Sequence, residues 1–123
     1  MVGIVIVSHS KKLAEGVIDL VRMNAKKVKI EAAGGLENEE YGVSLDRINE
    51  AIGKVCSDDG VLILCDLGSS IMTSEMAVEL NSDKKIILNK TSLVEGAFAA
   101  SIYAENGLSL EEINNKINEE IEK

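Results

Sequence analysis

The 123-residue sequence has no proline, no tryptophan and a single histidine, and its aromatic residues are two tyrosines and one phenylalanine. With so few rings, stacking platforms for single-stranded nucleic acid and flavin pockets are disfavoured. Basic residues are also scarce, 13 against 21 acidic ones, and the net charge of -8 opposes binding to a polyanion. We therefore expect protein or small-molecule partners and no nucleic acid.

Cysteines and long apolar runs are equally scarce. Cys56 and Cys65 lack the spacing of paired metal ligands, and one histidine cannot complete a zinc site with them, so no metal site is expected. Both cysteines are predicted to be buried, reduced thiols, as is typical of a cytoplasmic protein. The apolar run 2–7 is too short for a membrane span or a secretion signal, so no membrane association is expected.

What the sequence does contain is an alternation of strand and helix patterns. Its length suits one hydrophobic core, so residues 1–123 are expected to form a single domain. Strands are predicted from three apolar runs expected to be buried and from one alternating segment, namely 2–7, 61–65, 86–88 and 27–32. Helical spacing follows each strand, over about 11–21, 44–55, 69–80 and 93–105, and a capping box at Ser109 and Glu112 begins a last helix.

This order predicts an α/β fold of three layers with a mostly parallel, four-stranded sheet. The alternating segment 27–32 is typical of an edge strand, whereas 2–7 and 61–65 are the most apolar, which gives the strand order 2-1-3-4. The winding then reverses between the first and third strands. Ligands of such sheets bind beyond the carboxyl ends of the strands at this switch point, where the sequence places His9 and Asp66.

His9 is the first candidate catalytic residue, because it follows a buried strand and directly precedes a helix. Backbone N–H groups of Ser10, Lys11 and Lys12 at that helix start would attract an anion. An anion beside a histidine suggests a phosphoryl group. The alternative is a loop histidine without a function.

Asp66 is the second candidate catalytic residue. Its carboxylate could accept a hydrogen bond from one imidazole nitrogen and leave the other free as a nucleophile, or it could simply cap the next helix. Gly68, Ser69 and Ser70 could bind phosphate oxygens through N–H groups and hydroxyls, although such residues also commonly start helices.

Three further expectations concern residues outside the strand ends at His9 and Asp66. Thr91 and Ser92 are a less favoured phosphate loop, and Gly34-Gly35 is expected to end the second strand rather than bind a ligand. Met72 and Met76 lie four residues apart in a helical pattern, which indicates core or interface residues.

Common nucleotide-binding signatures are missing. The sequence has neither G-x-x-x-x-G-K-[ST] nor G-x-G-x-x-G after a strand, so no nucleotide cofactor is expected on this chain. A receiver domain, which is phosphorylated on an aspartate, shares the architecture but needs an acidic pair after the first strand. The chain has Ser8-His9-Ser10 there instead.

Four motifs occur in order along nearly the whole chain, I-V-I-V-S-H-S, E-A-A-G-G, D-L-G-S-S and L-V-E-G-A-F-A-A. Together they resemble the DhaM family, the phosphotransferase subunits of bacterial dihydroxyacetone kinase, which is a branch of the mannose-type enzyme IIA fold. In the sugar-permease relatives the loop after the third strand is typically longer, so the compact D-L-G-S-S favours the dihydroxyacetone branch.

The resemblance implies a phosphotransferase that works by a phosphohistidine relay. His9 would take a phosphoryl group from the carrier HPr, charged from phosphoenolpyruvate, and pass it to ADP on the DhaL subunit, which acts with dihydroxyacetone-binding DhaK. Mg-ADP is then expected on the partner and no cofactor on this chain. A homodimer and a short, single-domain form are also implied. Two alternatives stay open: a sugar-transport enzyme IIA that delivers phosphate to a IIB protein, and a noncatalytic anion-binding regulatory domain.

Overall fold

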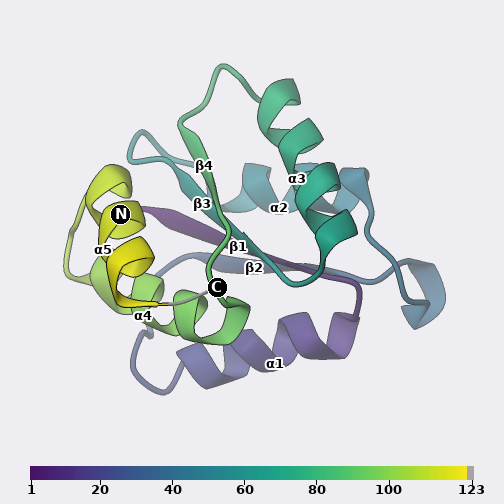
Figure 1. Ribbon diagram of the computed structural model, residues 1–123, viewed down its shortest axis with the longest axis horizontal. Helices are drawn as coiled ribbons and strands as arrows, with labels where there is room; N and C mark the ends of the chain where they lie inside the picture. The colour runs from purple at the N-terminus through teal and green to yellow at the C-terminus, as the bar shows by residue number, and fades with distance from the viewer. Residues whose placement is uncertain (122–123) are drawn as a thin grey trace.

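The computed structural model describes residues 1–121, which form a four-stranded parallel sheet covered by helices on both faces (Figure 1). The strands are β1 Gly3–Ser8, β2 Ile30–Gly34, β3 Val61–Cys65 and β4 Ile86–Asn89. The helices are α1 Lys11–Val21, α2 Leu45–Val55, α3 Gly68–Leu80, α4 Leu93–Glu105 and α5 Leu110–Glu120, with a short 3-10 helix, η1, at Glu37–Glu39. The order β2-β1-β3-β4 and the parallel pairing confirm the predicted fold and topology.

Side chains of the two central strands divide the core into two layers. Even-numbered residues such as Ile6 and Leu64 pack with α1, α4 and α5, and odd-numbered residues such as Val7 and Cys65 pack with α2 and α3. Figure 1 shows α3 on one side of the sheet and α1 and α4 on the other. Since both faces are covered, every residue of β1 and β3 is buried, which explains their continuous apolar runs.

The register of β1 and β3 aligns the ends of these strands. Ile6 pairs with Leu64, and Val7 pairs with Cys65. One residue further, the same register brings Ser8 beside Asp66, on the face that Ile6 and Leu64 share. The predicted switch point between the first and third strands is therefore present.

Strand β2 begins later than predicted. The expected segment was 27–32, but pairing with β1 runs over Ile30–Gly34. The backbone N–H groups of Lys27 and Val28 donate to the Glu105 carboxylate at the end of α4, so this segment is held by α4 instead of entering the ladder. The expectation of an edge strand is confirmed.

Strand β4 is less buried than predicted. It forms the other edge of the sheet, and the residues 86–88 are only half-buried. Asn89 is the buried residue of this strand, 2% exposed, and its side-chain amide donates to Asn114 and Asn118 of α5. The side-chain carbonyl oxygen of Asn89 accepts from the N–H and the hydroxyl of Thr91. A polar cluster therefore links β4 to α5.

Two packing expectations are corrected on the α2 and α3 side. Met72 and Met76 are 69% and 53% exposed, because α3 faces the sheet with Ser70, Ser74 and Ala77; they are not core residues. Cys65 is buried as predicted, but Cys56 is only half-buried. The reason is that Cys56 follows the last residue of α2.

The last helix begins as predicted, since the capping box of Ser109 and Glu112 is present. Within residues 1–121, no helix is both long enough and apolar enough to cross a membrane.

Candidate functional site

His9 lies between the end of β1 and the start of α1, with its side chain 25% exposed. Its N–H donates to Asp66 Oδ2 at 3.1 Å, and its carbonyl accepts from the N–H of Gly42 at 2.9 Å. The backbone is thus fixed on both sides of the residue. The imidazole is presented at the rim of the sheet, where another molecule can reach it.

The Asp66 carboxylate accepts four hydrogen bonds. Oδ1 accepts from the N–H of Leu67 at 2.7 Å and lies 3.1 Å from His9 Nδ1. Oδ2 accepts from the Ser8 hydroxyl at 2.8 Å and from the His9 N–H. Burial is the largest single influence on the pKa of Asp66 and raises it, but the hydrogen bonds together outweigh burial and lower the pKa to about 2. Asp66 is therefore ionised at neutral pH.

This ionised carboxylate sets the tautomer of His9. Because Asp66 can only accept, the proton of the neutral imidazole lies on Nδ1. Nε2 then carries the lone pair, and Ser69 Oγ lies 2.5 Å from it and donates to it. The arrangement makes Nε2 the nucleophilic atom, with a hydroxyl beside the position that an attached group would occupy.

The alternative of Asp66 as a helix cap is disfavoured by these contacts. Leu67 is the residue that immediately precedes α3, and the helix has no side-chain cap hydrogen bond. Apart from the N–H of Leu67, the donors to Asp66 belong to Ser8 and His9 across the sheet. The carboxylate is thus directed at the imidazole.

Four of the expected phosphate ligands lie around His9 with unused donors. Lys11 and Lys12 start α1, and Gly68 and Ser69 start α3. In the described part of the chain, none of their backbone N–H groups has a protein acceptor. Such N–H groups at helix starts are the donors that an oxyanion binds.

Ser10 and Ser70 do not fit the expected role. The Ser10 N–H donates to Ser8 Oγ at 3.0 Å, and the Ser10 hydroxyl caps α1 by accepting from the N–H of Leu13 at 3.2 Å. Ser70 is fully buried, and its N–H and hydroxyl both donate to the Leu67 carbonyl. The donors of both serines that were expected to bind phosphate are therefore used in hydrogen bonds within the protein, at the starts of α1 and α3.

Ser8 was not expected at the site, although it is fully buried there and contacts Asp66. The strand register is the signal that could have found it. Ile6 and Leu64 are paired across the sheet, and the same offset of 58 residues joins Ser8 to Asp66.

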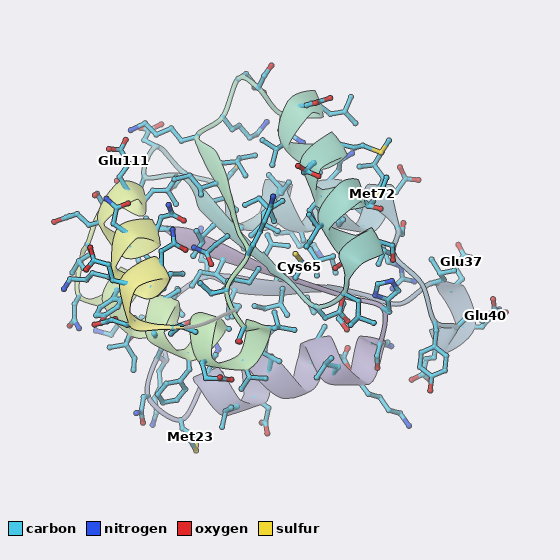
Figure 2. The ribbon with its side chains drawn as sticks, in the orientation of Figure 1. Met23, Glu37, Glu40, Cys65, Met72 and Glu111 are labelled. Atoms are coloured by element: carbon cyan, nitrogen blue, oxygen red, sulfur yellow. The ribbon has the colours of Figure 1, made fainter. Side chains whose placement is uncertain are left out.

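A cleft of about 160 Å³ adjoins the start of α1 and is lined by Ser10, Lys11, Lys12, Glu39 and Tyr41. Figure 2 shows Glu37 and Glu40 of the same loop at the end of the molecule opposite Met23. Both charge signs are therefore present on this side of His9. Across residues 1–121, no group of three or more His, Cys, Asp or Glu side chains is arranged to hold a metal ion.

The family model and the curated relatives that match this chain are described as phosphotransfer proteins. A family model, EIIA-man, described as the PTS system fructose IIA component, matches residues 3–118. The PTS-dependent dihydroxyacetone kinase phosphotransferase subunit DhaM of Lactococcus lactis is 41% identical over 115 residues, which cover 94% of this chain and 92% of that protein. A phosphoryl donor subunit DhaM of Listeria innocua is 43% identical over 99 residues, covering 80% and 78%. The DhaM of Escherichia coli is 36% identical over 120 residues, but the match covers only 25% of that longer protein.

Solved structures share the fold. A crystal structure of a protein of unknown function, EF1359, has a TM-score of 0.85 and 28% identity, covering 100% of this chain and 97% of the other. A sigma-54 interaction domain protein from Enterococcus faecalis has a TM-score of 0.73 at 18% identity, with coverage of 95% and 87%.

Proposed function

Because the chain belongs to the EIIA-man family of PTS proteins, and within it to the DhaM branch, we propose that it is the phosphoryl donor subunit of a PTS-dependent dihydroxyacetone kinase. His9 carries the phosphoryl group in this proposal, and Asp66 orients it. The observation that carries the proposal is the line of contacts from Asp66 through His9 to Ser69, which leaves one imidazole nitrogen nucleophilic at the rim.

The first step is transfer onto His9 from the phosphohistidine of HPr. The lone pair of His9 Nε2 attacks phosphorus, a new N–P bond forms, and the N–P bond of the donor breaks with its electron pair returning to the donor imidazole. Asp66 stabilises the positive charge that develops on the His9 ring. The Ser69 hydroxyl and the N–H groups at the starts of α1 and α3 bind the phosphoryl oxygens.

The second step is transfer to ADP bound on a DhaL subunit. A terminal oxygen of ADP attacks phosphorus, the bond to Nε2 breaks, and its electron pair returns to the imidazole, which yields ATP and free His9. DhaL then uses this ATP to phosphorylate dihydroxyacetone on DhaK. Magnesium and ADP belong to the partner in this proposal, as does the nucleotide cradle that the sequence lacks.

A second candidate is a sugar-transport enzyme IIA that delivers the phosphoryl group to a IIB protein. The description of the matching family model, a fructose component, favours it. It uses His9 in the same way and differs only in the acceptor. The names of the relatives with high coverage favour the dihydroxyacetone kinase instead.

One reconstitution tests the proposed function. The chain and His9→Ala are incubated with labelled phosphoenolpyruvate, enzyme I and HPr. We expect an acid-labile, alkali-stable phosphoprotein from the unchanged chain and none from His9→Ala. Label that survives His9→Ala, or no label on either protein, would refute the phosphohistidine relay.

The acceptor is tested next with the labelled chain. We expect DhaL with ADP, together with DhaK and dihydroxyacetone, to remove the label and a IIB protein to leave it in place. Discharge by the IIB protein alone would assign the chain to sugar transport.

The cellular compartment and the oligomeric state of the chain are part of the same proposal. We place it in the cytoplasm, where cysteines such as Cys56 and Cys65, which form no disulfide, stay reduced. The homodimer that the resemblance implies stays a prediction. Light scattering of the purified chain tests it by molar mass.

A further inference from the structure

Ser8 places a buried hydroxyl behind the two residues of the proposed relay. It ends β1 and is 0% exposed. Its hydroxyl donates to Asp66 Oδ2 at 2.8 Å and accepts from the N–H of Ser10 at 3.0 Å. Because the ionised Asp66 carboxylate can only accept and the Ser10 N–H can only donate, the single proton of this hydroxyl is directed at the carboxylate.

The contact contributes to the orientation of the Asp66 carboxylate, together with the N–H groups of His9 and Leu67. Oδ2 is held by Ser8 and by the His9 N–H, so Oδ1 is left to face His9 Nδ1. Rotation of the carboxylate would break both bonds to Oδ2. The Ser8 hydroxyl therefore acts on the imidazole through Asp66, without contact to the reacting nitrogen.

We propose that Ser8 is a positioning residue for phosphoryl transfer, whose hydroxyl holds Asp66 in the orientation that keeps the His9 proton on Nδ1 and Nε2 nucleophilic. The inference rests on the proposed function of His9. Ser8 thereby gains a role that neither the composition of the chain nor the chemistry of the helix starts indicated.

The chain offers a matched control for a purely structural role of this serine. Ser101 of α4 is also 0% exposed, and its hydroxyl has no hydrogen-bond partner among residues 1–121. Ser101→Ala thus removes a buried hydroxyl without removing a hydrogen bond. Ser8→Cys, which keeps the volume of the side chain but supplies a poor donor, accompanies Ser8→Ala as a second variant.

The first test needs no phosphoryl transfer. Nitrogen-15 NMR of the neutral imidazole measures which nitrogen carries the proton. We expect the proton on Nδ1 in the unchanged chain and in Ser101→Ala, and a mixture of both tautomers in Ser8→Ala and Ser8→Cys. An unchanged tautomer in both Ser8 variants would overturn the inference, whatever the function of the chain.

The second test measures the rate at which HPr phosphorylates His9. Ser8→Ala is expected to slow it about fivefold to tenfold, the effect of losing one hydrogen bond to an oriented charge. In an Asp66→Ala background, removal of the Ser8 hydroxyl is expected to have no further effect, since Ser8 acts through Asp66. An equal loss in both backgrounds would contradict the proposal. Absence of phosphorylation in the unchanged chain would instead contradict the proposed function, and the tautomer measurement would still decide the role of Ser8.

Discussion

The atoms that face each other in the site determine its chemistry. The two oxygens of Asp66 are each engaged by two donors, and one of the four is the Nδ1–H of His9. Only Nε2 is then left to react. In the proposed relay, transfer between two histidines conserves most of the bond energy, so the rate depends on orientation and on donors to the phosphoryl oxygens.

The lowered pKa of Asp66 predicts a pH dependence of folding. The folded-state pKa of about 2 lies below that of an unfolded aspartate, so ionised Asp66 stabilises the fold above about pH 4, and this stability is lost as pH falls toward the folded-state pKa. Urea denaturation between about pH 5 and pH 2 is expected to show a loss in the free energy of unfolding that Asp66→Asn lacks, at most about 2 kcal/mol. Identical pH dependence in both proteins would contradict it.

At the scale of elements, α3 is the helix that we expect a partner protein to contact. Ser69 contacts His9 Nε2, and Met72 lies one turn further on the same face of the helix, 69% exposed (Figure 2). A protein that brings phosphorus to Nε2 must cover the start of α3. We therefore predict that Met72 is an interface residue, which is the part of its sequence-based prediction that the structure does not test.

Met72→Glu is therefore expected to weaken docking of HPr. We expect the rate of His9 phosphorylation at low HPr concentration to fall about tenfold, the effect of one central interface residue, with unchanged thermal stability. Met23→Glu is the matched control, since Met23 is 61% exposed at the far end of the molecule. Equal rates for the two variants would exclude Met72 from the interface.

The polar cluster at the end of β4 predicts a second effect at this scale. Asn89→Ala removes two hydrogen bonds to α5 and leaves the buried N–H and hydroxyl of Thr91 without their acceptor. We expect a loss of about 2 to 3 kcal/mol in the free energy of unfolding, measured by urea denaturation. Asn115→Ala, an exposed position on α5, is expected to change it by less than about 0.5 kcal/mol. A similar small change for Asn89→Ala would show that the cluster does not stabilise the fold.

For the whole molecule, the sequence predicts the features that follow from how deeply each strand is buried. The apolar runs of β1 and β3 indicated both the strand order and the meeting of His9 with Asp66. Contacts between distant residues could not be predicted in this way. Glu105 accepts hydrogen bonds from the N–H groups of Lys27 and Val28, and β2 begins only after this segment. Ser10 and Ser70 donate to Ser8 and Leu67 in the turns that surround them, and not to a ligand.

A chain with one histidine can carry only one phosphohistidine, so the position of phosphorus on that ring tests the account most directly. The chain, labelled with nitrogen-15 in histidine, is phosphorylated through enzyme I and HPr, and NMR identifies the nitrogen bonded to phosphorus. We predict phosphorus on Nε2 of His9, because Nδ1 is hydrogen-bonded to Asp66. Phosphorus on Nδ1, or on a residue other than His9, would contradict the account.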